Sequence, residues 1–574
     1  MKSLIRAEKS ISLLKAVSAL VLLLFCTHKI SFRLESQMDL RFYDESYYLT
    51  QGFFHSPETW IADFSPLYSL WYRTASIFFC DPVALYYASY RFWAFLFGLM
   101  VFGILCFSRR AAARPGWLPF LPALLWAMAA TASELALPLW PKAGHLAMLG
   151  STIGMTGLFY WKNQRISQLC WIAGIGLLFS WCRPEFLAAA AASACLMPIA
   201  FFSGERKISM LSLLPLIPVL VFFFLWGFPL GQSGRGLVAF GQHFVHNWRN
   251  INGHNQTDFL QEWVNWRPIF RQYFGSASNP LEALMNNPPT MLQHLWFNLR
   301  YFVYNGLVYF SETIFPKRIF AVSPLYGFAA LLLLAEWKGN FRTAEILTTR
   351  VKRKGFSFFL PWICLALPPM LAGFLFQPRP HYILPLFPFF VLLMAEYFRP
   401  VKFHLPDRWQ AAFPLVLPLV FFYFLPNSTA FFRIKSGADL NQDQNLPDYK
   451  GHFEAITTSS LRNRALIENL RQYPFPAGFR IFDASTGATE YLGDRLTQCG
   501  KTGFEMNYKA LQDFPVFLDS ARVDGIFLHK TIYFDDAIMQ NSYWQAVRKT
   551  PGLLGWNKLA IGNAGDSLLI RNKR

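Results

Sequence analysis

The chain contains a series of long apolar windows, each carrying no charged residue or only one. We identify about eleven of them, at residues 13–27, 83–108, 117–139, 143–161, 166–181, 186–202, 208–228, 319–335, 356–376, 382–395 and 410–426. Each approaches the roughly 20 residues that a helix needs to cross the hydrocarbon core of a bilayer. With 53% hydrophobic and only 15% charged residues over 574 positions, the chain is too apolar for an ordinary soluble protein. The sequence therefore predicts a polytopic α-helical membrane protein with about eleven transmembrane helices, give or take two.

Basic residues around these windows predict how the chain is oriented. Lys2, Arg6 and Lys9 precede the first window and no small-residue cleavage site follows it, so we expect a retained anchor and a cytoplasmic N-terminus. If the helices alternate, the basic connecting segments fall on the cytoplasmic side, at residues 108–114, 161–165, 203–207, 336–355 and 399–408. Two long loops, 32–82 and 229–318, then lie on the outer side together with everything after residue 426. This topology requires the aromatic stretch 295–310 to lie along the membrane interface.

The formal net charge of +19 is held mainly by the membrane part. Residues 427–574 contain 18 Lys and Arg against 15 Asp and Glu, a net of +3, which leaves +16 of the +19 on residues 1–426. Basic cytoplasmic loops suit contact with anionic lipid. Because the sequence contains neither a basic recognition helix nor an aromatic RNA-binding strand motif, we expect no nucleic-acid partner.

The composition becomes normally polar after Pro426. There the patterns alternate between amphipathic helices and short apolar strands. We expect helices at 461–473 and 543–550 and strands at 479–484, 524–529 and 566–572. Residues 427–574 are therefore predicted to form a small α/β domain on the outer face, following the membrane domain of residues 1–426.

Two adjacent carboxylates, Asp44 and Glu45, stand among aromatic residues in the stretch "FYDESYYLTQG" just after the first apolar window. Such a stretch is often only a solvated loop. The functional alternative is that a carboxylate held at the interface accepts a proton from a hydroxyl while a lipid-borne substrate lies alongside.

The order of motifs along residues 1 to about 430 resembles the polytopic glycosyltransferases of the GT-C fold. The acidic pair is followed by Tyr48, by "SPLY" at 65–68, by Arg91 and, much later, by "HYILPLFP" at 381–388. This pattern is most similar to the group of protein O-mannosyltransferases and the lipid A aminoarabinose transferase, the family 39-like glycosyltransferases.

The resemblance implies a transferase that moves a sugar from a polyprenyl-phosphate donor to an acceptor hydroxyl on the outer face. The acceptor can be a protein, a lipid or a cell-envelope glycan. Asp44 would be the general base of an inverting displacement, with Glu45 beside it, and Tyr48 and Arg91 would bind substrate.

The lipid phosphate that leaves in such a reaction needs cationic partners. Arg379 and His381, followed by Tyr382, lie in a predicted outer turn and are the first candidates, because a guanidinium can bridge two phosphate oxygens. The same "PRPHY" turn can also be a helix end that anchors at the headgroups.

The chain departs from the family pattern where relatives carry a second acidic residue. The corresponding stretch, 137–149, offers Lys142 and His145 instead, which we take as candidate substrate-binding residues. The change indicates a different acceptor, a different donor charge or an inactive relative. Arg183 and Glu185 are interpreted as a structural pair, since opposite charges lower each other's cost at the membrane edge.

A metal site has weaker support. Asp63, where relatives carry an acid that helps to bind a metal, and His243 in the long outer loop could form a divalent site. Scattered histidines in such a loop are more often polar surface. We therefore assign no metal, and a divalent cation is left open.

A transporter or flippase for a lipid or glycan, without transferase activity, is the alternative function. It would need polar groups deep within several spans. The midplane regions contain few such groups: Arg91 and Glu134 are the obvious ionisable residues inside the apolar windows, and both could lie near an end, which favours the enzyme. A bacterial inner membrane is the preferred location over a eukaryotic secretory membrane, because the chain is compact and lacks large inserted domains.

Overall fold

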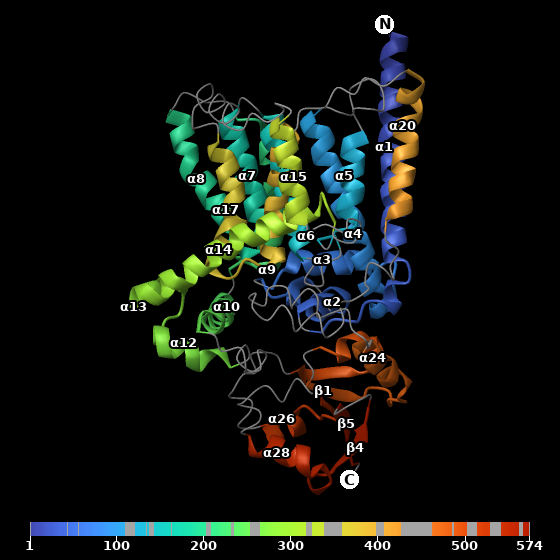
Figure 1. The fold of residues 1–574 in the computed structure, drawn as a ribbon. Coiled ribbons are helices and arrows are strands. Elements are labelled where there is room, and N and C mark those ends of the chain that lie inside the picture. The colour runs from blue at the N-terminus through green and yellow to red at the C-terminus, as the bar shows by residue number, and fades with distance from the viewer. Residues whose placement is uncertain are drawn as a thin grey trace.

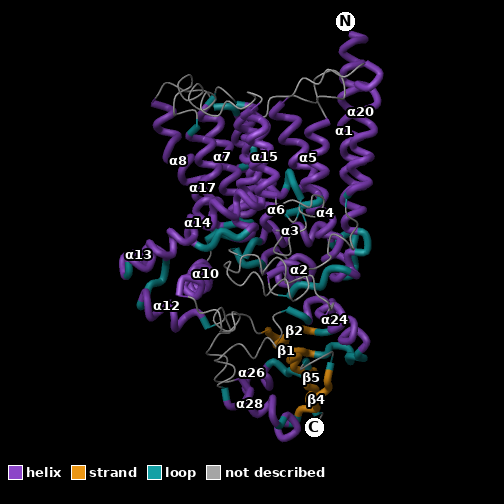
Figure 2. Tube along the Cα trace, in the orientation of Figure 1, coloured by secondary structure: helices purple, strands orange, loops and turns teal. Residues whose placement is uncertain are grey.

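The computed structural model of the chain is mostly helical, with a small sheet near the C-terminus (Figures 1 and 2). It describes residues 2–42, 44–54, 57–62, 64–109, 121–133, 135–136, 143–161, 164–202, 208–230, 235–252, 265–316, 324–337, 359–397, 407–425, 462–484, 487–501, 514–528, 541–561 and 566–572.

The first part of the chain forms a bundle of helices. Its members are α1 (Lys2–Ser31), α4 (Pro82–Arg109), α5 (Leu121–Thr131), α6 (Ala143–Tyr160), α7 (Arg165–Ser180), α8 (Leu187–Phe202), η5 (Met210–Leu213), α9 (Leu216–Trp226), α15 (Pro324–Trp337), α17 (Leu360–Leu375), α19 (Phe387–Tyr397) and α20 (Asp407–Phe424). Each of the eleven predicted windows contains a helix. Among the described residues, three stretches are long and apolar enough to cross a membrane: Ala16–Ser36, Pro82–Cys106 and Pro184–Phe202. The number of eleven spans stays a prediction.

Small residues on α6 let neighbouring helices approach closely. A Cβ added at Gly150 would lie 2.6 Å from the ring of Phe179 on α7, and one at Gly154 would lie 2.7 Å from Leu365 on α17. Close approach at small residues is a common way for helices to pack where no water drives them together. This packing fixes α6 between α7 and α17.

Further elements cover the end of the bundle nearest the C-terminal domain, which we call the domain-facing end (Figure 1). They are η1 (Leu34–Ser36), α2 (Asp44–Phe54), η2 (Pro57–Thr59), α3 (Pro66–Ala75), η4 (Pro184–Phe186), α10 (Arg235–Asn252), α12 (Trp266–Phe274), α13 (Pro280–Asn286), α14 (Pro288–Glu312), α18 (Pro380–Ile383) and η7 (Leu384–Leu386). The helix α14 runs obliquely across the lower part of the bundle in this view, and an interfacial position of residues 295–310 stays a prediction. Its first turn is capped by Asn287, whose side chain accepts from the backbone N–H of Thr290.

The described residues of the C-terminal domain form a five-stranded sheet in the order β2-β1-β3-β5-β4. Its elements are α24 (Arg462–Gln472), β1 (Arg480–Ala484), η8 (Thr489–Arg495), β2 (Thr497–Lys501), α26 (Phe514–Ser520), β3 (Gly525–Leu528), α28 (Ser542–Lys549), η10 (Pro551–Leu554), β4 (Trp556–Ala560) and β5 (Ser567–Arg571). The strand β1 pairs in parallel with β2 and β3, and β5 pairs antiparallel with β3 and β4. The α/β class and all five predicted elements are confirmed. The sequence pattern missed β4 because four of its five residues are exposed, so no apolar alternation marks it.

The two faces of this sheet belong to different cores. On one face Phe482, Phe514 and Trp544 form an aromatic core within the domain, with the last two rings stacked 4.7 Å apart. On the other, Ile467 of α24 and Tyr491 of η8 join the hydrophobic core of the bundle. The C-terminal domain is therefore packed onto the membrane part as well as linked to it.

Polar contacts fix this packing. The side chain of Asp39 accepts from the backbone N–H groups of Asn463 and Arg464, at 2.9 and 2.8 Å, and so caps the start of α24. At the other end of α24, Arg471 forms an ion pair with Asp81, which also accepts from the backbone of Val83 at the start of α4. Both ends of α24 are thus anchored to the domain-facing end of the bundle.

Candidate functional site

The predicted acidic pair forms the first turn of α2. Negative side chains are stabilised there by the partial positive charge of the helix N-terminus. Because successive residues of a helix point about 100° apart, the two carboxylates face different surroundings. Asp44 is partly exposed, whereas Glu45 is 3% exposed. Of the two, Asp44 is the one that a substrate can reach.

Glu45 is held by two tyrosines from α3. The Tyr68 hydroxyl donates to Glu45 Oε1 at 2.7 Å, and the Tyr72 hydroxyl, one helical turn later, donates to the same oxygen. Burial, with the negative charge of Glu45 next to them, raises the pKa of both tyrosines well above 10, so both remain donors. These contacts favour a structural role for Glu45, which joins α2 to α3.

Further aromatic rings surround this carboxylate. Tyr48, predicted to bind substrate, is buried with its ring 5.2 Å from that of Tyr68. We define the tyrosine cluster as Tyr68, Tyr72, Tyr86, Tyr90 and Tyr491: the ring of Tyr68 contacts that of Tyr72, and the ring of Tyr86 contacts those of Tyr90 and Tyr491. Burial and the charge of Glu45 raise the pKa of Tyr491 well above 10. Two members of the cluster, Tyr68 and Tyr72, therefore hold the acidic pair in place through their hydrogen bonds to Glu45.

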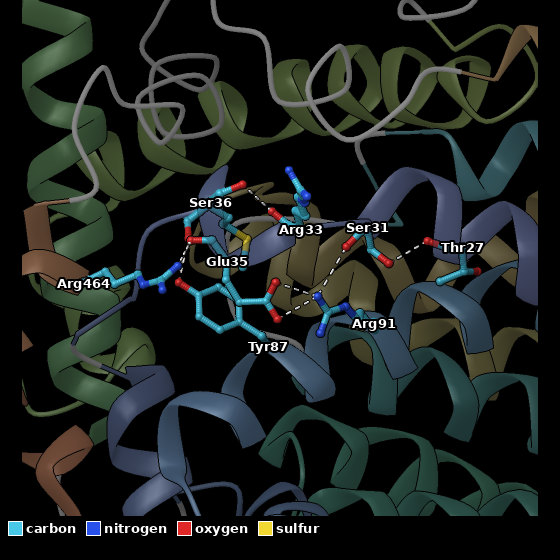
Figure 3. A network of polar contacts seen from close by, with 9 residues as sticks. Thr27, Ser31, Arg33, Glu35, Ser36, Tyr87, Arg91 and Arg464 are labelled. Atoms are coloured by element: carbon cyan, nitrogen blue, oxygen red, sulfur yellow. Dashed lines mark hydrogen bonds and ion pairs between the residues drawn. The ribbon is translucent and has the colours of Figure 1, made fainter. Parts of the chain in front are cut away.

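Arg91 lies outside this cluster. It forms an ion pair with Glu35 at 2.7 Å and donates to the Ser31 carbonyl at 3.5 Å (Figure 3). Arg464 of the C-terminal domain donates to the backbone carbonyl of Glu35 from the other side. The structure thus places Arg91 at the junction of α1, α4 and α24, and its neighbour Tyr90 in the tyrosine cluster.

A second group of functional side chains converges around α18. Gln377 Oε1 accepts from Arg379 Nε at 2.6 Å and lies 3.0 Å from His243 Nδ1 of α10. The other ring nitrogen of His243 lies 3.3 Å from the Tyr382 hydroxyl. The guanidinium of Arg183 stacks 4.3 Å from the centre of the Tyr382 ring. Residues from three separate parts of the chain thus meet in one place.

The charge of this group comes mainly from arginine. Burial, followed by the nearby charges of Arg379, His381 and His246, lowers the pKa of His243 well below 6.5, so its imidazole is neutral at pH 7. Arg183 forms the predicted ion pair with Glu185, at 2.8 Å. We call Arg183, His243, His246, Arg379 and His381 the cationic cluster after its two arginines, with His243 as a neutral member. Anions are the ligands that such a cluster fits.

The start of α6 and the start of α3 connect the two groups. A Cβ added at Gly144 of α6 would lie 3.0 Å from the backbone of His381. The next residue, His145, is fully buried: its Nε2 lies 3.0 Å from the Leu135 carbonyl, and its ring centre lies 6.3 Å from that of Trp93. The Trp93 ring in turn contacts Tyr68. His145 therefore lies between the cationic and tyrosine clusters as a packed core residue.

A direct hydrogen bond also joins the two sides. The Ser65 hydroxyl, just before α3, donates to the carbonyl of Cys182 at 2.6 Å, next to Arg183. Lys142 lies outside the described residues. The candidate site thus combines a partly exposed carboxylate and a cluster of arginine and histidine side chains at one end of the bundle.

The residues in the described ranges offer no cluster of three His, Cys, Asp or Glu side chains placed to hold a metal ion. His243 contacts Gln377 and Tyr382, and Asp63 lies outside those ranges.

Several residues of the site were not predicted from the sequence. Tyr68 and Tyr72 are separated by one helical turn, so their shared direction could have been read from "SPLYSLWY". Gln377 and Tyr491 carry no local signal, because their partners lie far away in the sequence.

A buried histidine beside the site predicts how stability depends on pH. His294 of α14 lies 3.0 Å from both the Leu375 carbonyl and Asn247 Nδ2, and burial lowers its pKa to about 4. Below pH 6.5 the His294 imidazole binds a proton in the unfolded chain but stays neutral in the folded protein. The free energy of unfolding should therefore fall by about 3 kcal/mol between pH 6.5 and 4. Thermal unfolding in detergent across this range should show a shallower decline for His294→Gln. Equal slopes in both proteins would contradict the prediction. The slope that remains in His294→Gln comes in part from His243, whose pKa is also lowered by burial.

No known protein-family model matches the chain, and no curated protein sequence matches it significantly. The function must therefore be argued from the geometry of this site.

Proposed function

We propose that this chain is a membrane glycosyltransferase of the GT-C type that moves a sugar from a polyprenyl-phosphate donor to an acceptor hydroxyl. The observation that carries the proposal is the combination at the domain-facing end. There the partly exposed Asp44 begins α2, which Glu45 joins to α3, and Ser65 just before α3 donates to the Cys182 carbonyl next to Arg183 of the cationic cluster. A base for a hydroxyl and cations for a phosphate are the two parts that this reaction requires.

Asp44 is the general base in this proposal. It accepts the proton of the acceptor hydroxyl while the oxygen attacks the anomeric carbon from the face opposite the phosphate. The new bond joins the acceptor oxygen to the anomeric carbon, and the bond between that carbon and the phosphate oxygen breaks. The electron pair leaves with polyprenyl phosphate, and the anomeric centre is inverted. Glu45 and the tyrosine cluster hold α2 in place during this step.

The cationic cluster stabilises the charge that develops on the phosphate. Arg379 is the first candidate, because a planar guanidinium can donate two parallel hydrogen bonds to phosphate oxygens. Its Nε already donates to Gln377, which fixes the direction of the side chain. Neutral His243 and the hydroxyl of Tyr382 complete a set of donors. The sugar and the acceptor, whether a protein, a lipid or a glycan, are left open.

The proposal includes a location. We place the domain-facing end on the outer side of a bacterial inner membrane, with the C-terminal domain in the periplasm and the N-terminus in the cytoplasm. The three apolar stretches that can cross a membrane support an integral membrane protein. The basic connecting segments support the orientation.

The test is turnover by the detergent-purified full chain on a panel of polyprenyl-phosphate sugars. Release of polyprenyl phosphate, with or without an added acceptor, would be followed by mass spectrometry. Turnover of at least one donor is expected. If no donor is bound or turned over, the donor class is wrong, and translocation of the same lipids by the protein in vesicles becomes the measurement that supports a transporter.

Arg379→Gln should weaken binding of polyprenyl phosphate about tenfold or more, because a hydrogen bond to a charged group contributes about 1.5–3 kcal/mol. Arg379→Lys keeps the charge but loses the planar pair of donors, and should lie between wild type and the glutamine variant. Titration of the purified protein with the lipid measures both affinities. Arg300→Gln, at an exposed position on α14, is the matched control and should bind as wild type does. Unchanged affinity in Arg379→Gln would remove Arg379 from the phosphate site.

A further inference from the structure

One segment of the C-terminal domain lies directly against α2. Gly487, between β1 and η8, has a backbone φ of 123°, a conformation that favours glycine. A Cβ added there would lie 2.1 Å from the hydroxyl oxygen of Ser46, the residue after Glu45. The backbone of the domain therefore approaches the first turn of α2 more closely than any other residue type would allow.

The same segment contacts α2 at two further places. Glu490, only 4% exposed, accepts a hydrogen bond from the hydroxyl of Thr50 in the second turn of α2. The hydroxyl of Tyr491 donates to the carbonyl of Arg41, just before α2 begins. Contacts thus reach the residues before α2, its first turn and its second turn.

The segment is itself anchored in the domain. Asp483, fully buried at the end of β1, accepts from both the backbone N–H and the hydroxyl of Thr489, at 3.0 and 2.7 Å. On the other side, Arg471 of α24 donates to the carbonyl of Tyr491 at 2.7 Å while it pairs with Asp81. The position of the segment is therefore fixed by the sheet and by α24 together.

We infer that Gly487–Tyr491, the docking segment, positions the acidic pair of α2, so that the C-terminal domain is a structural part of the active site. The docking segment touches α2 and the tyrosine cluster, and it is not placed to touch the reacting atoms. Glu490 and Tyr491 are accordingly positioning residues. The catalytic side of this inference rests on the proposed function, whereas the docking itself does not.

A buried carboxylate at the contact supports a lasting interface over a transient one. A carboxylate taken out of water is costly unless its hydrogen bonds are made, and Glu490 accepts one from Thr50, whose hydroxyl also lies 2.9 Å from the Ser46 carbonyl within α2. A domain that only captured a partner from solution would have no need of such a contact with α2.

The experiment compares Gly487→Ala with Gly552→Ala in the full chain. An added Cβ at Gly552 of η10 meets nothing within 4 Å, so this substitution is a matched control in the same domain. The first readout is hydrogen–deuterium exchange of α2, which needs no substrate. We expect exchange in Asp44–Phe54 to rise at least tenfold in Gly487→Ala and to stay unchanged in Gly552→Ala, with β1 and β3 protected in both.

The second readout is turnover of a lipid donor. Displacement of Asp44 should lower kcat about 10- to 100-fold, since small misplacements of catalytic groups have effects of this size. The KM for the donor should stay unchanged, because the cationic cluster is untouched. A substitution that merely destabilised the protein would not separate kcat from KM in this way. Adding Ser46→Ala removes the oxygen that the new Cβ meets and should restore part of the loss.

Thr50→Val provides an independent variant for the case in which Gly487→Ala fails to fold. It removes the hydrogen bond to Glu490 from the side of α2 and should raise exchange in α2 several-fold. The inference is overturned if α2 exchanges in Thr50→Val, and in any folded Gly487→Ala, as it does in the control. If wild type turns over no donor, the proposed function fails, and the exchange of α2 alone then decides whether the segment positions this helix.

Discussion

Asp44→Asn should lower kcat for sugar transfer by at least 100-fold while the protein still binds polyprenyl phosphate. Asparagine keeps the size of the side chain but cannot accept the proton of the acceptor hydroxyl, and general-base catalysis contributes about 10²- to 10⁴-fold. The partly exposed position of Asp44 at the start of α2 makes the substitution mild for the fold. Initial rates at saturating donor, together with lipid binding by the same preparation, separate loss of chemistry from loss of substrate.

A matched control for this prediction is Asp519→Asn. Asp519 is an exposed aspartate of the C-terminal domain that pairs with Arg571, and it lies away from α2. Its substitution should leave turnover at the wild-type level. If Asp44→Asn retains a rate within about threefold of wild type, another group must act as the base.

Glu45→Ala should have the largest effect on stability among substitutions at the acidic pair. It leaves two fully buried tyrosine hydroxyls, of Tyr68 and Tyr72, without the acceptor that they share. An unsatisfied buried donor costs about 1–3 kcal/mol, so the free energy of unfolding should fall by about 2–6 kcal/mol. Thermal unfolding in detergent should show a clearly lower midpoint than for Asp44→Ala, because the side chain of Asp44 is partly exposed.

Removing the hydroxyls tests the cause of this loss. In a protein that already carries Glu45→Ala, Tyr72→Phe should cost little or even restore stability, whereas in wild type it should destabilise. Such a cycle measures the interaction between the carboxylate and the hydroxyl. Additive effects of the two substitutions would show that Glu45 stabilises α2 by some other contact.

The fold was predictable where local patterns decide it. Apolar windows located the helices of the bundle, and the patterns after residue 426 located α24, β1, β3, α28 and β5. The domain-facing ends of the helices were less predictable, because irregular turns such as those around α18 and η4 depend on which helices meet there.

The site was predictable in part. The acidic pair and the turn containing Arg379 and His381 were identified from residue type and position, and the structure gathers that turn with His243. Arg91, which the resemblance groups with the acidic pair, pairs with Glu35, and its role in substrate binding stays a prediction. Spacing indicates that a residue lies on a helix, but the face that packs against a given neighbour follows from tertiary contacts. On α4, the ring of Tyr90 packs in the tyrosine cluster, whereas the next residue, Arg91, forms an ion pair with Glu35.

The capping of α24 by Asp39 has a consequence for the order of biosynthesis. The two partners, Asp39 and Asn463, are 424 residues apart, and at ~5–20 residues per second a ribosome needs about 20–85 s to make the intervening chain. Throughout that time the residues that lead into α2 have been made while the helix that they cap has not. The segment that leads into α2 and its acidic pair therefore reaches its final environment only after the last part of the chain has been translated. A nascent or truncated product that ends within the membrane part would lack this environment, so completion of the chain is built into the maturation of the site.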